Sequence, residues 1–260
     1  MSTNANGQHD VLQTQKATIR FGGLTAVNEL DMNVKQGEIY GLIGPNGAGK
    51  TTIFNLLTGV YEPTSGEIYF DGKRIDGLRP YQIASRGISR TFQNIRLFPS
   101  MSVLENVMTA CHIHVGQNLF DAVLRTPRYV NDEKKHREYC FELLEIFDLA
   151  RVSDEGGTSL PYGSQRRLEI VRALATRPKL LLLDEPAAGM NPSEQEDLMH
   201  LIKQIRDRFG LTILLVEHNM KVVMGVCERI QVVDYGKCIA LGLPQEIKND
   251  PKVIEAYLGD

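Results

Sequence analysis

The sequence predicts an α/β fold with a mainly parallel core sheet. Short apolar runs alternate with helical patterns along most of the chain, as expected where a helix follows each parallel strand. The run Leu180–Leu183 is apolar throughout, and Thr212–Val216 is apolar after its first residue. Because strands of this composition are covered on both faces, they are typical of parallel sheets with helices on each side.

Strands are predicted where an apolar run is bounded by turn residues. The second predicted strand leads into a glycine-rich segment and then into a helix over Thr52–Leu57. In chain order the strands are Ala17–Phe21, Glu38–Ile43, Glu67–Phe70, Leu180–Leu183, Thr212–Val216 and Ile230–Asp234.

Capping-box patterns predict the starts of two further helices, because a Ser and a later Glu can satisfy each other's backbone N–H groups. Ser102 with Glu105 precedes a helix over Val103–Ala110. Ser193 with Glu196 begins a second helix. Apolar residues at helical spacing predict buried stripes, namely Leu198, Leu201, Ile202 and Ile205 in that second helix, and Cys140, Leu143, Leu144 and Phe147 in another.

The organisation of the chain changes near residue 95. The following residues are helical in pattern and contain no buried-strand run until the alternation resumes at Leu180. We therefore expect one domain, in which a helical subdomain is inserted into an α/β core. The predicted bounds are 11–260 for the domain, 11–94 and 163–260 for its core, 95–162 for the subdomain, 1–10 for a flexible N-terminal tail, and 116–132 for a loop or a pair of short helices.

Composition disfavours several classes of function. The chain has 260 residues, 42% of them hydrophobic, and a formal net charge of −3, which argues against a disordered protein and a generally basic nucleic-acid binder. Its longest apolar runs are far shorter than the roughly 20 residues of a membrane-spanning helix, and Met1–Asp10 lacks the apolar core of a signal peptide. We expect a soluble, cytoplasmic protein with reduced thiols, since no C-x-x-C spacing occurs among Cys111, Cys140, Cys227 and Cys238.

The strongest motif is Gly44–Thr52, which fits the pattern G-x-x-x-x-G-K-[ST] between a predicted strand and a predicted helix. Glycines let such a loop fold tightly enough for its N–H groups to point at phosphate oxygens, and the helix N-terminus adds a favourable dipole. Lys50 would place its charge on the β- and γ-phosphates, and the Thr51 hydroxyl would bind Mg²⁺. The predicted nucleotide-binding residues of this loop are Gly44, Pro45, Asn46, Gly47, Ala48, Gly49, Lys50, Thr51 and Thr52.

Two acids end the apolar run that begins at Leu180. Asp184 and Glu185 emerge at the carboxyl end of that strand, where α/β sheets bind ligands. Asp184 is placed to hold Mg²⁺, directly or through water, and Glu185 would orient and deprotonate the attacking water. Together with the glycine-rich loop, these acids predict a P-loop nucleoside triphosphatase.

Further motifs, in the same order along the chain, resemble those of the ATP-binding cassette (ABC) family. Gln93 resembles the family's Q-loop glutamine, Leu160–Arg167 sits where the signature loop belongs, and His218 resembles the switch histidine. Asn191 lies at the D-loop, and Phe21 lies where the family stacks an aromatic ring on adenine. The predicted fold is therefore that of an ABC cassette, with an antiparallel β part near the N-terminus and the helical insert.

The resemblance implies a mechanism shared by two cassettes. Cassettes of this family form head-to-tail homo- or heterodimers, in which ATP lies between the phosphate loop of one copy and the signature loop of the other. ATP and Mg²⁺ are the implied cofactors. The residues implied to contact the ATP of the opposite cassette are Pro161, Tyr162, Gly163, Ser164 and Gln165. Those implied to bind Mg²⁺ are Thr51, Gln93 and Asp184, and those implied in catalysis are Glu185, His218 and Lys50. Phe21 is implied to contact adenine, and Asn191 lies in the D-loop.

Two positions depart from the family pattern. The usual signature begins Leu-Ser-Gly-Gly-Gln, but Pro161 replaces the serine and has neither a hydroxyl nor an N–H group. Either this site is weakened and relies on a partner's signature, or Gly163, Ser164 and the helix dipole suffice, which is the interpretation we favour. Asn191 replaces the D-loop aspartate, so it keeps hydrogen-bonding capacity and loses the charge.

Other segments resemble the larger ATPase subunit of branched-chain amino-acid importers: Phe21–Val27, Gln165–Ile170, Asp184–Pro192 and Ile254–Gly259. This resemblance implies an energy-coupling subunit at the cytoplasmic face of the cell (inner) membrane. Its implied partners are a second cassette, integral-membrane permease subunits and, indirectly, a periplasmic or extracellular substrate-binding protein, with no nucleic acid. The alternatives are a cassette for urea, amide or lipopolysaccharide, a soluble ABC ATPase of DNA repair or translation, and a P-loop kinase.

Two surfaces allow competing interpretations. The segment Gln93–Glu105, with Phe98 and Met101, is either a groove for a permease helix or a buried hinge. A group of basic residues is better explained as a solvated helix face than as a nucleic-acid site, because the net charge is mildly acidic: Arg166, Arg167, Arg172 and Arg177.

Overall fold

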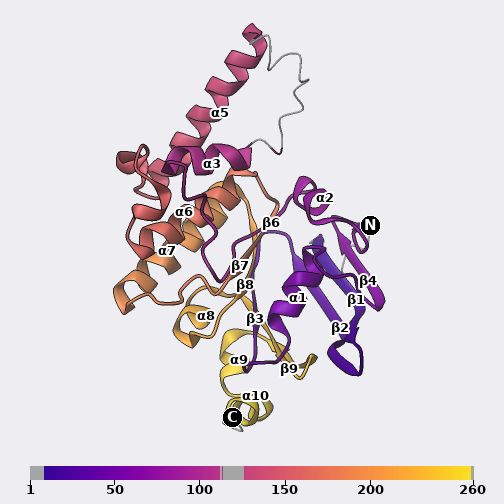
Figure 1. Ribbon diagram of the computed structural model, residues 1–260. Helices are drawn as coiled ribbons and strands as arrows, with labels where there is room; N and C mark the ends of the chain where they lie inside the picture. The colour runs from indigo at the N-terminus through magenta and orange to yellow at the C-terminus, as the bar shows by residue number, and fades with distance from the viewer. Residues whose placement is uncertain (1–8, 112, 114–125, 259–260) are drawn as a thin grey trace. The chain divides into compact units, whose positions relative to one another are not determined.

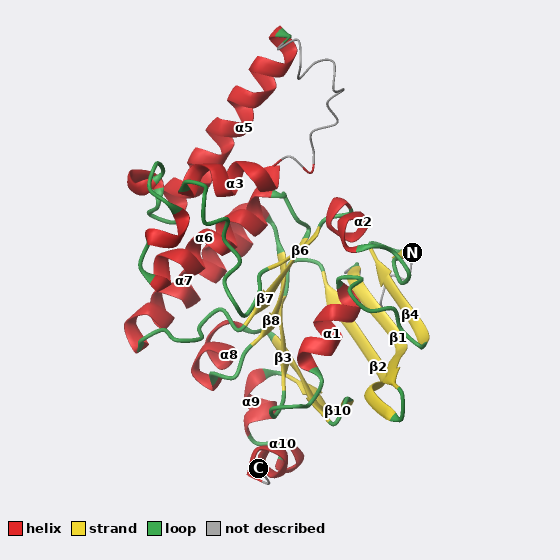
Figure 2. Ribbon diagram, viewed as in Figure 1, coloured by secondary structure: helices red, strands yellow, loops and turns green. Residues whose placement is uncertain are grey.

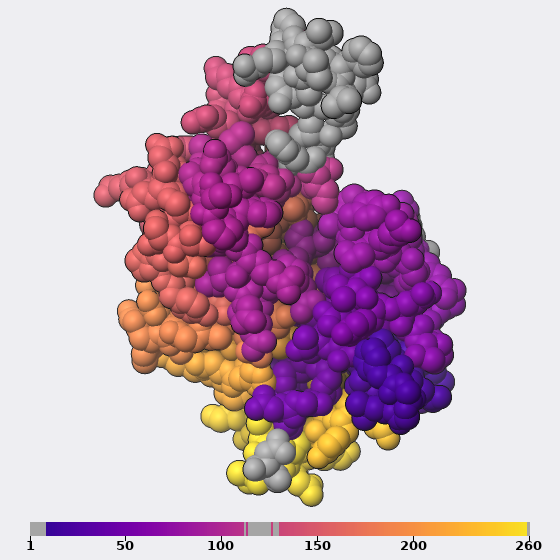
Figure 3. Space-filling view, in the orientation of Figure 1, coloured from indigo at the N-terminus to yellow at the C-terminus, as the bar shows by residue number. Residues whose placement is uncertain are grey.

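The computed structural model describes residues 9–111, 113 and 126–258 (Figure 1). The chain forms two compact units. The core unit comprises Met1–Arg90 and Lys179–Asp260, and the helical unit comprises Thr91–Pro178. Figure 2 shows that the described strands belong to the core unit, whereas the described part of the helical unit is built from helices and loops. Figure 3 shows the same face of the described residues as a space-filling view.

The larger sheet of the core unit has the strand order β10-β9-β3-β8-β7-β6. All neighbouring pairs are parallel except β10 with β9, which confirms the mainly parallel sheet. Each residue of β3, β7 and β8 is buried, as the apolar runs predict. The strands are β3 (Ile39–Ile43), β6 (Ile88–Arg90), β7 (Leu180–Asp184), β8 (Thr212–Val216), β9 (Arg229–Asp234) and β10 (Lys237–Gly242).

A second, antiparallel sheet has the order β2-β1-β4-β5, which confirms the antiparallel part near the N-terminus. Asp10, which the sequence analysis places in a flexible tail, is instead the buried first residue of β1. The rest of that predicted tail, residues 1–8, lies outside the described residues. The strands are β1 (Asp10–Phe21), β2 (Leu24–Lys35), β4 (Ser65–Phe70) and β5 (Lys73–Arg74).

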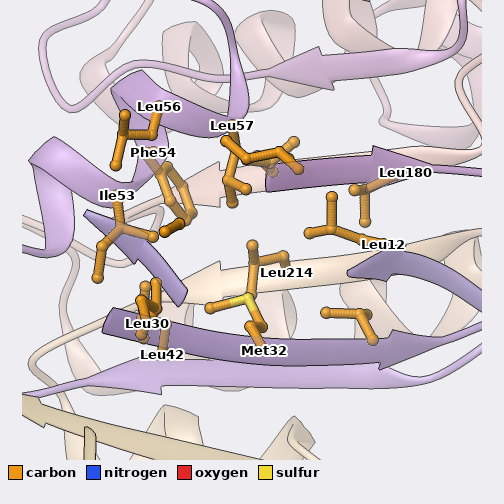
Figure 4. Packing of buried hydrophobic residues seen from close by; sticks show 14 of the residues in the cluster. Leu12, Leu30, Met32, Leu42, Ile53, Phe54, Leu56, Leu57, Leu180 and Leu214 are labelled. Carbon is orange, nitrogen blue, oxygen red and sulfur yellow. The ribbon is translucent and has the colours of Figure 1, made fainter. Parts of the chain in front are cut away.

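The hydrophobic core of this unit lies between the two sheets and helix α1 (Lys50–Leu57). Figure 4 shows side chains of all three elements gathered in one cluster: Leu12 and Met32 of the antiparallel sheet, Leu180 and Leu214 of the parallel sheet, and Phe54 of α1. Burying these side chains stabilises the core by roughly 1.5–3 kcal/mol each. The helix that follows the glycine-rich loop is thereby held firmly against both sheets.

The remaining core helices are α2 (Pro80–Ser85), α7 (Pro192–Phe209), α8 (Met220–Val226), α9 (Pro244–Lys248) and α10 (Pro251–Leu258). The predicted stripe of α7 is buried. Its predicted cap is wrong, because the Asn191 side chain accepts hydrogen bonds from the N–H groups of Ser193 and Glu194, and Glu194 completes the capping box. The helix therefore begins two residues earlier than a Ser193 cap predicts, with proline in its first position, where no N–H is needed.

The described part of the helical unit contains α3 (Val103–Cys111), α5 (Pro127–Ile146), α6 (Tyr162–Ala175) and the short 3₁₀ turns Ala150–Val152 and Gly157–Ser159. The capping box of Ser102 with Glu105 is confirmed by hydrogen bonds of 2.8 and 3.2 Å. The stripe that includes Cys140 and Phe147 is buried. Residues 116–125 of the predicted irregular segment lie outside the described residues, and its last part, from Pro127, belongs to α5.

The bounds of the helical unit differ from the predicted subdomain. The unit extends over Thr91–Pro178, whereas the sequence predicts 95–162. Helix α6 accounts for most of the difference, because it packs against α3 and α5. Its residues Leu168 and Val171 are buried, and they belong to the helical unit.

The cysteines are free thiols, as predicted. Cys111 of α3 and Cys140 of α5 lie with their sulfurs 3.0 Å apart inside the helical unit. Among the described residues, no helix is both long enough and apolar enough to cross a membrane.

Candidate nucleotide-binding and catalytic site

The glycine-rich loop joins β3 to α1, and its glycines are required by close backbone approaches. At Gly44 (φ 156°) a Cβ atom would lie 2.0 Å from the Val233 carbonyl oxygen. At Gly49 (φ 102°) it would lie 2.7 Å from the carbonyl oxygen of Ala26. Any larger residue would push the loop away from these strands, so the glycines fix its path.

Lys50 is buried within the curve of this loop. Its ammonium group donates hydrogen bonds to the carbonyl oxygens of Gly44, at 2.6 Å, and Pro45, at 2.7 Å. Burial lowers the pKa of Lys50, and the nearby carboxylates of Glu185 and Asp184 oppose that effect. The loop thus encloses a positive charge in the position that the sequence predicts for binding phosphate.

The N-terminus of α1 supplies further donors. The helix begins at Lys50, so the backbone N–H groups of Thr51 and Thr52 lie in its first turn, where α-helical hydrogen bonding leaves N–H groups unpaired. No side chain caps the helix. The Thr51 side chain is exposed beside this helix end, where it is able to reach a bound anion or cation.

Asp184, the last residue of β7, forms a buried ion pair with Arg90 of β6. An Arg90 nitrogen lies 2.7 Å from Asp184 Oδ2, and another donates to Asn55 Oδ1 of α1, also at 2.7 Å. The guanidinium group also lies 5.3 Å from the centre of the Phe54 ring. Arg90 therefore links the predicted magnesium ligand to the helix of the phosphate loop. Sequence reasoning missed Arg90 and Asn55, because only the pairing of β6 with β7 brings them to Asp184.

Glu185 and His218 come together at the carboxyl ends of neighbouring parallel strands, β7 and β8. His218 Nε2 lies 2.8 Å from Glu185 Oε1. Glu185 adopts a left-handed backbone conformation (φ 47°), and its N–H donates to the Val216 carbonyl oxygen at 2.8 Å. Two residues that the sequence predicts as catalytic thus form one hydrogen-bonded pair, with both side chains partly exposed.

Asn191 caps α7, as described above, so the D-loop position has a structural role in this chain. A carboxylate or an amide oxygen can accept the same two N–H bonds. Loss of the charge is therefore compatible with an intact loop.

Phe21, at the end of β1, lies edge-to-face with Tyr61 at a centroid separation of 5.2 Å. Both rings are exposed. Such a pair offers apolar surface against which a planar base can stack. The role of Phe21 in holding adenine stays a prediction, and the sequence does not predict the neighbouring ring of Tyr61.

In the helical unit, the predicted signature loop opens α6, with Pro161 as its exposed N-cap residue. Gly163 and Ser164 lie in the first turn, where helix N–H groups are unpaired. Gln165 turns back, and its amide donates to the Leu160 carbonyl oxygen at 2.7 Å. The N-terminus of α6 therefore offers backbone N–H groups as hydrogen-bond donors, whereas Pro161 offers none.

Arg166 corrects the expectation of a solvated arginine face, since it is buried. It donates to the carbonyl oxygens of Phe92, at 2.8 Å, and Gln93, and it forms an ion pair with Glu169. Glu169 in turn accepts from the Phe92 N–H at 3.2 Å. The start of α6 thus holds the backbone of the predicted Q-loop within the same unit.

Two predictions for the helical unit are not resolved by these contacts. The ligation of Mg²⁺ by Gln93 stays a prediction, because Thr51 and Asp184 belong to the core unit. At the segment Gln93–Glu105, Phe98 is exposed and stacks with the Arg172 guanidinium at 4.9 Å. Both interpretations of that surface therefore stay open.

The fold and the site together define a P-loop nucleoside triphosphatase: a glycine-rich loop around a buried lysine, and two acids at the end of the adjoining parallel sheet. The family model described as ABC transporter matches residues 27–188. The chain belongs to the ABC transporter family, and it is an ATP-binding ATPase of that family. A second family model, described as branched-chain amino acid ATP-binding cassette transporter, matches residues 237–260.

Curated relatives match nearly the whole chain. The high-affinity branched-chain amino acid transport ATP-binding protein BraF of Pseudomonas aeruginosa is 46% identical over 96% of this chain and 98% of its own length. The corresponding protein LivG of Escherichia coli is also 46% identical, with the same coverage. The lipopolysaccharide export system ATP-binding protein LptB of Haemophilus influenzae is 36% identical, over 96% and 98% of the two chains.

Solved structures show the same fold. The ADP conformation of MJ1267, an ATP-binding cassette of an ABC transporter, has a TM-score of 0.84 and 31% identity, and covers 97% of this chain and all of that one. The dimeric structure of MJ0796, a bacterial ABC transporter cassette, has a TM-score of 0.75 and 26% identity over 90% and 98% of the two chains. These matches do not favour a P-loop kinase or an ABC ATPase of DNA repair or translation.

Proposed function

We propose that this chain is the ATP-hydrolysing subunit that powers an importer of branched-chain amino acids. The observation that carries hydrolysis is the Glu185–His218 pair beside the phosphate loop. The substrate class is supported by the relatives named above and by the family match at residues 237–260. The identity to those relatives exceeds the identity to the lipopolysaccharide cassette, and this difference favours amino-acid import over the other transport systems.

In the proposed mechanism the core unit binds ATP and activates water. The N–H groups of the loop and Lys50 hold the phosphates, and Phe21 contacts adenine. Glu185 accepts the proton of the attacking water, and His218 donates a hydrogen bond that orients the carboxylate and contacts the γ-phosphate. Because the two side chains already touch, little reorganisation precedes the reaction.

The residues present fit a magnesium ion. A threonine hydroxyl (Thr51) and a carboxylate (Asp184) of the core unit, together with phosphate oxygens, are the hard oxygen donors that Mg²⁺ prefers. Gln93 is the further ligand that the sequence predicts. Among the described residues, no group of three or more His, Cys, Asp and Glu side chains is placed to hold a metal ion. When bound, the ion neutralises charge on the phosphates.

We further propose that two cassettes pair head to tail, so that α6 of one faces the ATP of the other. The first turn of the 14-residue helix α6 contains Gly163 and Ser164, whose backbone N–H groups are free of α-helical hydrogen bonds. The dipole of the helix also favours an anion at this end. These donors replace the missing hydroxyl at Pro161. The partners are a second cassette, the same or different, permease subunits, and indirectly a substrate-binding protein, which places the chain at the cytoplasmic face of the cell membrane.

The test is purification of the full chain from membranes of its host, followed by reconstitution of whatever accompanies it. A permease pair whose ATPase activity rises with leucine, isoleucine or valine is the expected result. Stimulation by urea, an amide or lipopolysaccharide instead would correct the substrate. Recovery with ribosomes or DNA, and no membrane protein, would overturn the transport function.

A further inference from the structure

Glu217 is a buried carboxylate that the mechanism above does not use. It follows directly after β8, and only 3% of its surface is exposed. Oε1 accepts a hydrogen bond from the Ala187 N–H at 2.7 Å. Oε2 accepts from the N–H groups of His218, at 3.0 Å, and Asn219, at 3.2 Å. Burial raises the pKa of Glu217, and these three N–H donors oppose that effect because they stabilise the ionised form.

These bonds join the two turns that contain the proposed catalytic residues. Ala187 belongs to the turn after β7, whose first residue is Glu185, and the Ala188 N–H donates to the Glu185 carbonyl oxygen at 3.1 Å. His218 belongs to the turn after β8. One carboxylate therefore holds the backbone beside the predicted base with one oxygen and the backbone of the switch histidine with the other.

A second bridge connects the same two turns. The Asn219 side-chain amide donates to Gln195 Oε1 at 2.9 Å. The Gln195 amide in turn donates to the Met190 carbonyl oxygen, next to the D-loop, at 3.0 Å. Asn219 is itself fixed, because its Oδ1 caps α8 by accepting from the Lys221 N–H at 3.0 Å. The turn after β8 is thus tied to both ends of the turn after β7.

We propose that Glu217 is a positioning residue for ATP hydrolysis, which sets the separation of His218 and Glu185 by clamping the two turns together. Both catalytic side chains extend from short turns, and a displacement of about 1 Å in either one is enough to lower a rate as much as 100-fold. Glu217 itself contacts backbone groups and not the nucleotide. The inference rests on the proposed catalytic roles of Glu185 and His218.

The test is the variant Glu217→Gln in the full chain, compared with Glu38→Gln. Glu38 is a matched control, since it is another buried glutamate of the core unit; it accepts from the Lys35 N–H and pairs with Arg229 at the start of β3. The amide of Glu217→Gln must turn an NH₂ group toward at least one backbone N–H donor, so that the turns separate. The Glu185 N–H bond to β8 is unaffected, which favours retention of the fold.

We expect Glu217→Gln to lower kcat by about 10- to 100-fold, with KM for ATP and the affinity for ATP within about twofold of the parent protein. The backbone amide proton of Ala187 should move upfield in the ¹H–¹⁵N spectrum, and the ring signals of His218 should shift. Glu38→Gln should lose thermal stability but keep kcat. A purely structural role would instead lower stability in both variants and kcat in neither.

Two results would overturn the proposal: an unchanged Ala187 amide signal, or an unchanged kcat in a Glu217→Gln protein whose amide signal has moved. The amide signal is independent of the proposed function. If Glu185→Gln retains full hydrolysis while the Ala187 signal responds as expected, the roles assigned to the catalytic pair are wrong and the clamp itself stands as a structural feature.

Discussion

His218 Nε2 lies 2.8 Å from Glu185 Oε1, although the two residues are far apart in the sequence. Their strands are parallel neighbours in register, with Asp184 paired to Val216, so both side chains leave the sheet at the same edge. A hydrogen bond to an imidazole fixes the orientation of a carboxylate that is to accept a proton. Hydrolysis is therefore expected to depend on both residues as a unit.

Glu185→Gln should keep ATP binding and lose turnover, because the amide cannot accept the proton of the attacking water. We expect kcat to fall by about 10²- to 10⁴-fold. Persistent ATP should also trap the closed pair of cassettes, visible as a dimer in size-exclusion chromatography with ATP and Mg²⁺. An unchanged ATPase rate would remove Glu185 as the base.

His218→Ala should lower kcat by about 10²-fold or more, since Glu185 loses its hydrogen-bond donor and the γ-phosphate loses a contact. His200 provides the matched control, because it is an exposed histidine on α7 of the same unit. His200→Ala should hydrolyse ATP at the parent rate. Equal losses in both variants would point to a general effect of histidine removal and not to the pair.

Lys50→Ala should weaken nucleotide binding. The variant lacks the ammonium group that donates to the carbonyl oxygens of Gly44 and Pro45. It therefore lacks the buried positive charge of the phosphate loop. A charged hydrogen bond of about 1.5–3 kcal/mol corresponds to roughly 10- to 100-fold in affinity. Titration with a fluorescent ATP analogue measures this; Lys203→Ala, an exposed position of α7, should bind as the parent does.

Arg90→Met should destabilise the fold even without nucleotide. Arg90 and Asp184 are 7% and 6% exposed, so the variant loses a buried ion pair and leaves the Asp184 carboxylate buried without the Arg90 charge. The expected loss is about 3–5 kcal/mol in the free energy of unfolding, measured with urea. Adding Asp184→Asn to this variant should restore part of that loss. If the double variant is no more stable than the single one, the ion pair does not explain the effect.

Pro161→Ser tests the altered signature loop. We expect the hydrolysis rate to stay the same, because the first turn of α6 already offers N–H groups at Gly163 and Ser164. The comparison requires ATPase rates at saturating ATP in the same assembly. A clear rise in rate would show that proline weakens the site, and hydrolysis would then depend on the signature loop of a different partner cassette.

Several features of this protein can be predicted from the sequence, because they depend on the residue pattern of a short segment. The runs at Leu180 and Thr212 are buried strands, and the loop Gly44–Thr52 lies between a strand and a helix, as predicted. Local rules did less well where a strand is short or irregular. β6 has only three residues, β10 is largely exposed, and β1 and β2 are interrupted by bulges that break the alternation.

The sequence by itself determined the phosphate loop, the order of the motifs and the residue types of the site, because backbone conformation and side-chain chemistry are set within a few neighbouring residues. Tertiary structure alone decided which side chains meet. Arg90 reaches Asp184 only through the pairing of β6 with β7, and Glu217 clamps two turns only because β7 and β8 are adjacent. The sequence likewise predicts Arg166 as a surface residue, whereas the packing of α6 buries it. Such contacts join residues distant in the chain, and no local pattern encodes their separation.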